Sequence, residues 1–406
     1  MFKDFALQIG TKFVFGRDAE CKVGAELAQL GAGKALIHHD GSSYLEDTGL
    51  LPAIRNSLAA EGIGYVELAG VQPNPRLSLV REGIDLAKRI GVDAVLAIGG
   101  GSAIDSAKAI ALGAASDRDV WDYFTGAATP ARTLPVAVVL TLPASGSESS
   151  QVAVINNTEK GMKLLVSAPV VRPALAFMNP KLSTTLPAFQ TACGIVDMFS
   201  HICERYFTDD PEFGVIDGMA EAVLRTLCDI GPKCLAEPDN YDHRAQIMWI
   251  STIAQNNTLG VGRDQDWSTH IIGNELSALY DIPHAATLSI VMGSWMRAAC
   301  TGNPARFARY AREVFGLEDE AGDVSTLASR GIEATEAFFR SLGMPVSFIE
   351  FGVPTNEVDR MLDNIEFFGP DQAIGSVARL NRDDCRRVYE AAFEGAQTSK
   401  TPEAMP

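Results

Sequence analysis

The first half of the chain alternates short apolar runs with longer amphipathic segments. The runs at 34–38, 64–68 and 94–98 have the length and continuous hydrophobicity of buried strands. Between them, residues 50–61 and 79–90 carry apolar side chains at helical spacing. Strands that alternate with helices of about ten or more residues are typical of βαβ units. This half is therefore predicted to be an α/β domain with a parallel sheet.

The pattern changes near residues 179–187, where prolines flank a Ser/Thr-rich stretch. Before this point, further strands are expected at 13–15, 136–140, 163–166 and 175–178. Beyond it, strand patterns disappear and helical spacing dominates. Helices are expected at 187–203, 217–228, 244–260, 269–280, 290–299, 304–315, 324–342 and 382–395. We therefore predict an α/β domain over residues 1–183 and an all-helical domain over residues 184–406, with a ligand in a cleft between them.

The composition is that of a folded protein. Of the 406 residues, 47% are hydrophobic and 21% are charged, and the length suits two cores better than one. Lysine and arginine number 34 against 51 acidic residues, for a net charge of −17. A binder of phosphate backbones normally carries a basic face, so nucleic acids and anionic membranes are not expected as partners.

Targeting signals and disulfides are not expected either. No apolar run approaches the roughly 20 residues of a membrane helix, and Lys3, Asp4 and Gln8 interrupt the N-terminal segment. The seven cysteines are scattered and form no CxxC pair. This usage predicts a reducing compartment, the cytoplasm.

One predicted strand runs directly into a glycine-rich turn. The tetrapeptide Gly-Gly-Gly-Ser at 99–102 follows the strand expected at 94–98, and residues 103–112 have a helical pattern. Consecutive glycines allow close approach of a ligand to the backbone, and the helix N-terminus directs free N–H groups at the turn. The pattern favours a pyrophosphate site. A strand-to-helix turn without a ligand remains the alternative, because the GxGxxG fingerprint is absent.

Two further loops follow predicted strands and could border a nucleotide. Residues 141–148 are rich in hydroxyl groups, although Ser/Gly loops are common. Residues 39–43 include Asp40, and an acidic residue at this place can bind both ribose hydroxyls of NAD and repel the 2′-phosphate of NADP. Ser42 and Ser43 could instead donate to that phosphate. A capped turn with no ligand is also possible.

A carboxylate and three histidines form a candidate metal site. Asp197 and His201 are four residues apart and share one face of a predicted helix. His270 and His284 lie fourteen residues apart further along the chain. One carboxylate and three imidazoles suit Zn²⁺ or Fe²⁺ better than Ca²⁺ or Mg²⁺. By spacing alone, a surface hydrogen bond between Asp197 and His201 remains open.

Together these segments resemble the iron-containing (group III) alcohol dehydrogenases, in particular the branch of butanol dehydrogenases and broad aldehyde reductases. GGGSAIDSAK at 99–108 matches the phosphate loop of the family, and TLPASGSES at 141–149 matches its loop over the nucleotide. GIVDMFSHICERY at 194–206 and DWSTHIIGNELSALYDIPHAATLSIV at 266–291 match its metal-binding segments. The similarity extends over nearly the whole chain.

The resemblance implies a dehydroquinate-synthase-like architecture, NAD or NADP, and one divalent metal, Fe²⁺ or Zn²⁺. The implied metal ligands are Asp197, His201, His270 and His284. The residues implied at the dinucleotide are Asp40, Gly41, Ser42, Gly99, Gly100, Gly101, Ser102, Asp105, Thr141, Leu142, Ser147 and Lys163. Asn257 and Trp267 are candidates for the substrate pocket, although a plain core or loop role accounts for them equally well.

The chain departs from the family pattern at two places. Relatives usually have a histidine four residues after the first of the late ligands, where this chain has Asn274. No catalytic side chain is therefore expected beyond the metal ligands. NADP-using relatives often have Gly-Gly-Gly-Ser where this chain has Asp-Gly-Ser-Ser at 40–43, and NAD-using relatives often have an aspartate. Asp40 thus favours NAD slightly.

The implied reaction is hydride transfer between NAD(P) and a primary alcohol or aldehyde of about the size of butanol. A divalent cation would ease loss of the alcohol proton and polarise the carbonyl in reverse. One alternative is a lyase or cyclase of the same fold, but the metal segments lack the basic cluster that a phosphorylated substrate needs. Another is a non-catalytic nucleotide-binding protein, which only Asn274 favours. A homodimer is expected, as in many relatives.

Overall fold

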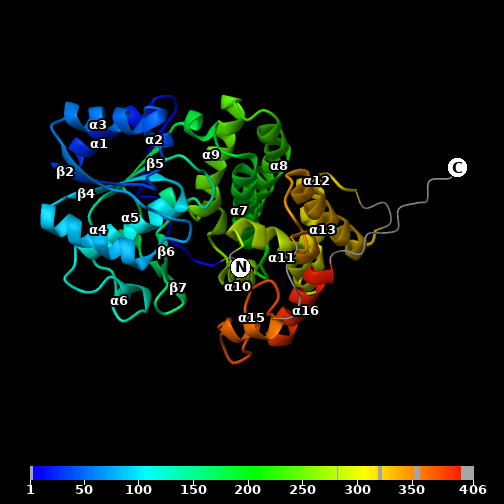
Figure 1. Cartoon of the computed structure of the whole chain (residues 1–406). Coiled ribbons are helices and arrows are strands. Elements are labelled where there is room, and N and C mark those ends of the chain that lie inside the picture. Colours follow the sequence, from blue (N-terminus) through cyan, green and yellow to red (C-terminus); the bar gives the residue numbers. More distant parts are fainter. Residues whose placement is uncertain (1–2, 281, 319–321, 352–356, 395–406) are drawn as a thin grey trace. The chain divides into compact units, whose positions relative to one another are not determined.

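The structure is a computed structural model that describes residues 3–280, 282–318, 322–351 and 357–394. These residues form two compact units (Figure 1). The α/β unit comprises residues 8–186 and 238–256. The helical unit comprises residues 3–7, residues 187–237 and the described residues from 257 on.

The α/β unit is built on a six-stranded sheet in which every pair of neighbours is parallel. The order of the strands is β1-β8-β5-β4-β2-β3. The predicted parallel sheet is thus confirmed, and its central strands are continuously apolar because helices cover both faces. The strands are β1 (Lys12–Phe15), β2 (Lys34–His38), β3 (Gly64–Leu68), β4 (Ala94–Gly99), β5 (Val136–Leu140) and β8 (Leu175–Met178).

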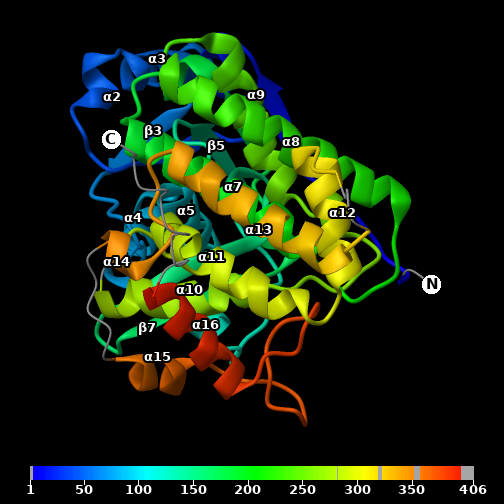
Figure 2. The ribbon, with the colours of Figure 1, turned by 90° about the vertical axis from the view of Figure 1, so that its right-hand side faces the viewer.

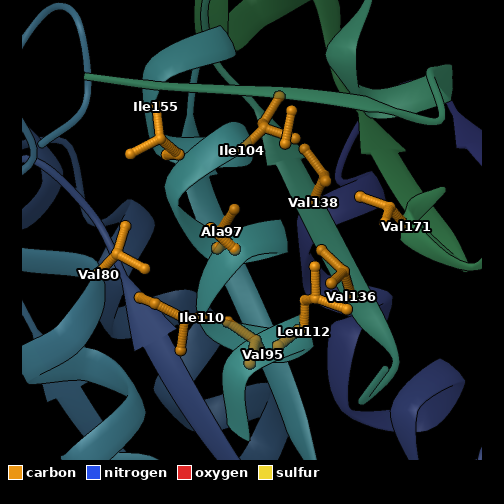
Figure 3. Packing of buried hydrophobic residues seen from close by; sticks show 14 of the residues in the cluster. Val80, Val95, Ala97, Ile104, Ile110, Leu112, Val136, Val138, Ile155 and Val171 are labelled. Atoms are coloured by element: carbon orange, nitrogen blue, oxygen red, sulfur yellow. The ribbon is translucent and has the colours of Figure 1, made fainter. Parts of the chain in front are cut away.

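Two layers of helices sandwich this sheet (Figure 1). The helices α1 (Val23–Gln29) and α3 (Leu50–Ala60) pack on the face that includes Leu96, and α4 (Leu77–Ile90) and α5 (Gly101–Ala114) pack on the face that includes Val95. Figure 3 shows the second core close up, with side chains of α5 interdigitating with those of β4 and β5. The shorter helices of this unit are η1 (Ala19–Lys22), α2 (Tyr44–Asp47), α6 (Trp121–Phe124), η2 (Ser147–Ser149), η3 (Pro169–Val171) and η4 (Pro180–Ser183).

A separate antiparallel hairpin lies outside the main sheet. It pairs β6 (Val152–Asn157) with β7 (Met162–Ser167), and β7 includes the strand expected at 163–166. The sequence analysis did not anticipate β6. Its side chains alternate in burial, and Ile155 packs against the α5 core (Figure 3). Two asparagines at its end resemble a turn, which obscures so short a strand.

One helix from the second half of the chain belongs to the α/β unit. Helix α9 (Tyr241–Gln255) was expected among the helices of the second domain, but it packs against η2 and η4. Thr252 donates a hydrogen bond of 2.7 Å from its hydroxyl to the buried carboxylate of Glu148. Gly146 allows the close approach, because a Cβ there would lie 2.5 Å from the carbonyl oxygen of Ser251. A buried carboxylate requires such partners, and helical periodicity alone does not reveal them.

The helical unit is organised around α7 (Ala188–Tyr206), whose side chains are buried almost without interruption from Thr191 onward. Helices α8 (Gly214–Ala236) and α11 (His284–Cys300) pack against it (Figure 2). The predicted helical character is confirmed, since the only strand-like pairings in the described part of this unit are isolated bridges between 368 and 380. The other helices are η5 (Thr258–Gly260), α10 (Ser268–Tyr280), α12 (Pro304–Phe315), α13 (Val324–Ser341), α14 (Phe348–Phe351), α15 (Val358–Asn364) and α16 (Arg382–Glu394).

None of the helices in the described ranges combines the length and the apolar character that crossing a membrane would require.

Candidate metal and nucleotide sites

The glycine turn forms the N-terminus of α5 as the sequence predicts. The residue before the helix, Gly100, caps it without a side chain, so the first N–H groups of the helix have no acceptor within it. A Cβ at Gly99 would lie 2.8 Å from the Cβ of Ala103, and one at Gly101 would lie 2.5 Å from Oγ of Ser145. Side chains would therefore fill the cradle, whereas glycine leaves the backbone accessible. The turn fits an anionic pyrophosphate.

The sheet brings three predicted segments to one edge of the α/β unit. Strands β2, β4 and β5 are parallel neighbours, so their carboxyl ends lie on the same side of the sheet. These ends continue into residues 39–43, 99–102 and 141–149. The N–H of Thr141 donates to the carbonyl of Gly99 over 3.1 Å, which joins the second and third segments. This edge is where open α/β sheets bind ligands.

The turn after β2 presents an exposed carboxylate. Asp40 accepts a hydrogen bond of 2.9 Å from the backbone N–H of Ser42, which closes a small turn around Gly41. Gly41 has φ +83°, a conformation that favours glycine. Its N–H donates to Nδ1 of His39 over 3.0 Å. The three predicted residues of this turn are thus held in one defined conformation.

Asp105 and Ser147, both predicted at the nucleotide, contact each other. The hydroxyl of Ser147 donates to Asp105 over 2.5 Å, and the ammonium of Lys108 donates to Ser147 over 2.7 Å. Lys108 also donates to the carbonyls of Ser150 and Val152. Burial raises the pKa of Asp105 and lowers the pKa of Lys108 to about 8. This network fixes the loop after β5 onto α5, a role of Lys108 that the sequence analysis did not assign.

Lys163 lies on the β6–β7 hairpin. Its ammonium donates a hydrogen bond of 3.0 Å to the side chain of Asn74. Its charge also acts to lower the pKa of Asp105, although burial of that carboxyl group is the larger influence. Lys163 therefore lies close enough to α5 to affect the electrostatics of the phosphate turn.

The four predicted metal ligands meet in the helical unit. Asp197 and His201 are on α7, His270 is on α10, and His284 begins α11. The Nε2 atoms of the three histidines lie 3.8, 3.8 and 3.9 Å from one oxygen, Oδ1 of Asp197. These separations are too long for hydrogen bonds. A tetrahedral ion with bonds of about 2.1 Å would put its ligand atoms about 3.4 Å apart, which is close to this arrangement.

The electrostatics of this cluster favour a cation. Burial acts to raise the pKa of Asp197, but the surrounding imidazoles outweigh it and hold that pKa below its usual range. Burial acts to lower the pKa of His270, but Glu204 and Asp197 raise it to about 9. Negative potential from two carboxylates thus holds a proton on His270. A divalent metal would displace this proton and satisfy the same potential.

Glu204 is a functional residue that the sequence analysis missed. It is fully buried on α7, its carboxylate pairs with Nδ1 of His270, and its Oε1 accepts the backbone N–H of His270 over 3.0 Å. This contact leaves Nε2 of His270 directed toward Asp197. The signal was present in the sequence, because positions 197, 201 and 204 fall on one face of a helix. A carboxylate behind a metal-binding histidine fixes its orientation.

Among the buried atoms of the cluster that lack a hydrogen-bond partner in the described residues are Oδ1 of Asp197 and Nε2 of His270. Buried polar atoms without a partner are costly, and a cation between them would satisfy both. The donor set of one carboxylate and imidazole nitrogens is also that of Zn²⁺ and Fe²⁺ sites. The residues present therefore fit a metal.

Trp267 borders the metal cluster. Its ring lies edge-on to His201 and His270, with centroids 5.9 and 5.4 Å away, and the guanidinium of Arg205 lies 4.6 Å from its centre. The backbone there has φ +63°, an uncommon conformation that turns the chain into α10. Trp267 thus lies directly beside two of the candidate metal ligands.

The remaining predicted positions lie in different surroundings. Asn257 precedes η5, and its side-chain oxygen accepts a hydrogen bond of 2.5 Å from Gln265. This contact is within a loop. Asn274 is half-buried on α10, one helical turn beyond His270.

Comparison with known proteins identifies the family. Residues 10–180 match the family described as iron-containing alcohol dehydrogenase, and residues 191–393 match the C-terminal region of the Fe-containing alcohol dehydrogenase family. The chain belongs to the iron-containing alcohol dehydrogenase family. It is accordingly a metal-dependent oxidoreductase of alcohols and aldehydes that uses a nicotinamide dinucleotide.

Individual relatives of this family member cover almost its whole length. A probable NADH-dependent butanol dehydrogenase of Bacillus subtilis is 37% identical over 94% of this chain and 98% of the relative. The NADPH-dependent aldehyde reductase YqhD of Escherichia coli is 35% identical over 96% of this chain and 99% of the relative. The crystal structure of an NADH-dependent butanol dehydrogenase of Thermotoga maritima superimposes with a TM-score of 0.91, at 37% identity, and covers 97% of this chain and 99% of that one.

Proposed function

We propose that this protein interconverts short primary alcohols and aldehydes of about four carbons, with NADH as the preferred reductant. The observation that carries the proposal is the convergence of three imidazoles on Oδ1 of Asp197, with Glu204 behind one of them. The printed names of the relatives, butanol dehydrogenase and aldehyde reductase, support this substrate class.

In this proposal, Asp197, His201, His270 and His284 hold one Zn²⁺ or Fe²⁺. The bound metal would supply Lewis-acid polarisation of the substrate oxygen. Glu204 pairs with Nδ1 of His270 and so orients its Nε2 towards the metal, which would displace the proton there. Trp267 excludes water from one side of the cluster and offers an apolar surface to an aliphatic substrate. Asn257 would also line the substrate pocket.

The nucleotide would bind at the edge of the α/β unit. Residues 99–102 would hold the pyrophosphate through backbone N–H groups, and Asp105 and Ser147 would keep the neighbouring loop in place. Thr141 and Leu142 would border the nucleotide, and Lys163 would reach the ribose of the nicotinamide. Asp40 would accept both hydroxyls of the adenosine ribose, and Gly41 and Ser42 would shape that turn. This arrangement favours NADH over NADPH.

Position 274 has a positioning role in the proposal. An amide donates and accepts hydrogen bonds but does not exchange a proton with a substrate at neutral pH. Asn274 therefore orients the substrate or the nicotinamide and does not relay a proton.

We also propose a reducing compartment, the cytoplasm, and a homodimer for this chain. All seven cysteines are free thiols, which is the usual state in a reducing compartment. The dimer rests on the resemblance to family members alone.

The direct experiment measures butanal-dependent oxidation of NADH and of NADPH by protein reconstituted with Fe²⁺ or Zn²⁺. We expect turnover with either metal-loaded form and a larger kcat/KM with NADH. His270→Ala is the matched variant, and it should lose both metal and turnover while its circular dichroism spectrum stays that of the wild type. Full activity and full metal content in this variant would overturn the assignment of the metal site.

A further inference from the structure

His39 is held in one tautomer by the cofactor turn. Its Nδ1 accepts the backbone N–H of Gly41 over 3.0 Å, so Nδ1 carries no proton. The proton of the neutral ring is therefore on Nε2. That atom is buried, and the nearest carboxylate oxygen, on Glu67, is 4.0 Å away. The bond to Gly41 exists only while the ring is neutral, because an imidazolium has no acceptor nitrogen.

The backbone of His39 is also fixed. Its N–H donates to the carbonyl of Leu68 over 3.3 Å, and its carbonyl accepts the N–H of Val71 over 3.2 Å. The side chain is only 7% exposed. These bonds anchor the main chain at His39, so we do not expect protonation of the ring to displace the backbone of this residue. The response to protonation must instead fall on the exposed turn at 40–43.

Charged groups from three neighbouring elements act on this ring. Glu67 on β3 and Glu46 on α2 favour the imidazolium, as does Asp40, and Arg55 on α3 opposes it. Arg55 is itself engaged by both glutamates, through bonds of 2.6 Å and 2.8 Å to Glu67 and 2.6 Å to Glu46. Burial is the largest influence, and it lowers the pKa of His39 below that of a free imidazole. The ring is accordingly neutral at pH 7.5.

We propose that His39 is a positioning residue that sets the choice between NADH and NADPH through the turn at 40–43, and that its protonation loosens this choice. The inference rests on the proposed role of Asp40 in binding the adenosine ribose. Neutral His39 accepts from Gly41 and presents the Asp40 carboxylate to the ribose hydroxyls. In the imidazolium form, Nδ1 carries a proton and cannot accept the N–H of Gly41, so the turn loses this hydrogen bond. It also places a positive charge on the residue next to Asp40, and this charge attracts a 2′-phosphate.

Acidification should therefore affect the binding of the two nucleotides differently. Acidification should weaken binding of the NAD form, because the ordered turn is lost. It should weaken binding of the NADP form less, or strengthen it, because the new positive charge beside the turn attracts the 2′-phosphate. The pH window lies below the ordinary imidazole pKa of about 6.5, because burial depresses the pKa of His39.

Calorimetric titration with NAD⁺ and NADP⁺ tests this on the zinc-loaded protein between pH 5.5 and 7.5, and again on metal-free protein. Both nucleotides are stable in acid, and binding requires no turnover. We expect the Kd for NAD⁺ to rise by about threefold or more at the lower pH and the preference for NAD⁺ over NADP⁺ to shrink correspondingly. The 2′-phosphate of NADP⁺ itself titrates near pH 6. The same titrations on a protein variant that lacks the histidine are therefore needed to separate the two effects.

His39→Asn is that variant. The side-chain oxygen of asparagine takes the place of Nδ1 and accepts from Gly41 at every pH. We expect wild-type affinity for NAD⁺ at pH 7.5 and less than half of the wild-type pH dependence. His243→Asn, at a half-buried histidine of α9 in the same unit, should retain the full wild-type dependence. If His39→Asn follows the wild-type curve, His39 does not set the preference.

A second measurement needs no variant. Hydrogen–deuterium exchange at the ring C2–H, followed by mass spectrometry, gives the pKa of each histidine in the wild type. NAD⁺ should bind the neutral form of His39. Saturation with NAD⁺ should therefore lower the pKa of His39, and its acid dissociation constant should rise by the same factor by which protonation weakens NAD⁺ binding. An unchanged pKa of His39 on saturation would overturn the inference.

The control Asp40→Gly separates this inference from the proposed function. If Asp40→Gly leaves the NAD⁺ to NADP⁺ preference unchanged, the proposed role of the turn fails, and the inference fails with it. If Asp40→Gly shifts the preference while His39→Asn keeps the wild-type pH dependence, the turn selects the cofactor and only the role of His39 is refuted.

Discussion

At the residue scale, two adjacent histidines show how partners select the chemistry of a side chain. His38 lies 2.9 Å from the carbonyl of Leu68 through Nδ1 and 2.8 Å from the hydroxyl of Ser106 through Nε2. A carbonyl only accepts, so Nδ1 of His38 carries the proton. His39 has the opposite tautomer, because its Nδ1 accepts from Gly41. The first ring ties elements of the core together, and the second is bonded to the turn at 40–43.

A single carboxylate at position 40 should decide the preference between nucleotides. Asp40→Gly removes an acceptor for the ribose hydroxyls and a charge that repels the 2′-phosphate. We expect the ratio of kcat/KM for NADH to that for NADPH to fall by about tenfold or more, which corresponds to about 1.4 kcal/mol. Steady-state kinetics with butanal measure it. Asp47→Gly, at the end of α2, serves as the control, and an equal effect there would argue for general electrostatics.

Glu204 should control metal affinity without contacting the metal. Glu204→Gln preserves the shape of the side chain but removes the charge that pairs with His270. We expect the affinity for Zn²⁺ to fall by roughly 10- to 100-fold, as measured by competition with a chromogenic chelator. Glu212→Gln removes an exposed partner of Arg309 and should change nothing. Wild-type affinity in Glu204→Gln would exclude the orienting role.

At the scale of the elements, His38 joins β2 to the end of β3 and to α5, and it does so in its neutral form. Burial lowers its pKa to about 4, whereas in the unfolded chain it is about 6.5. The unfolded chain therefore takes up a proton first on acidification. The contribution of neutral His38 to stability is complete above pH 6.5 and is lost as the pH falls from 6.5 towards 4.

This linkage predicts a difference between two unfolding curves. Between pH 7.5 and pH 5.5, the free energy of unfolding should fall by about 1 kcal/mol more in the wild type than in His38→Gln. Urea unfolding at the two pH values measures the change for each protein. Subtracting the change of His38→Gln from that of the wild type removes the contribution of other titrating groups. The control His243→Gln should behave as the wild type. Parallel curves for the wild type and His38→Gln would contradict the neutral state of His38.

Two departures from the sequence pattern share a physical cause. Strand β6 was not anticipated, and helix α9, expected as a helix of the second domain, belongs to the α/β unit. Both are placed by partners remote in the chain. Val154 of β6 donates to Asp105 on α5, and Thr252 of α9 donates to Glu148. Buried carboxylates require such donors. A local pattern of hydrophobic residues contains no record of a hydrogen bond across more than forty or a hundred positions.

At the scale of the whole molecule, the candidate metal and nucleotide residues belong to different compact units. A ligand stabilises the part of a protein that it binds, so each ligand should slow local opening in its own unit. Backbone hydrogen–deuterium exchange should therefore respond differently to the two ligands. Zn²⁺ should protect α7 and α10, and NAD⁺ should protect the start of α5 and residues 39–43. Protection by NAD⁺ confined to the helical unit would contradict the proposed nucleotide site.

The sequence by itself determined most of the strand and helix pattern, the glycine turn and the set of candidate metal-binding side chains. These features are local, or they carry the chemistry of a motif that tolerates few other residues. The pattern also predicted the parallel sheet, since apolar runs that alternate with helices leave few other arrangements.

Only the tertiary structure decided how these residues act on one another. Asp197, His270 and His284 come from three helices. The two histidines approach Oδ1 of Asp197 because of the way α7, α10 and α11 pack. The buried carboxylate of Glu204 and the tautomer of His39 likewise follow from partners that folding supplies. Hydrogen bonds and charge interactions between side chains are short-ranged in space and unrestricted in sequence, and for that reason the chain pattern cannot specify them.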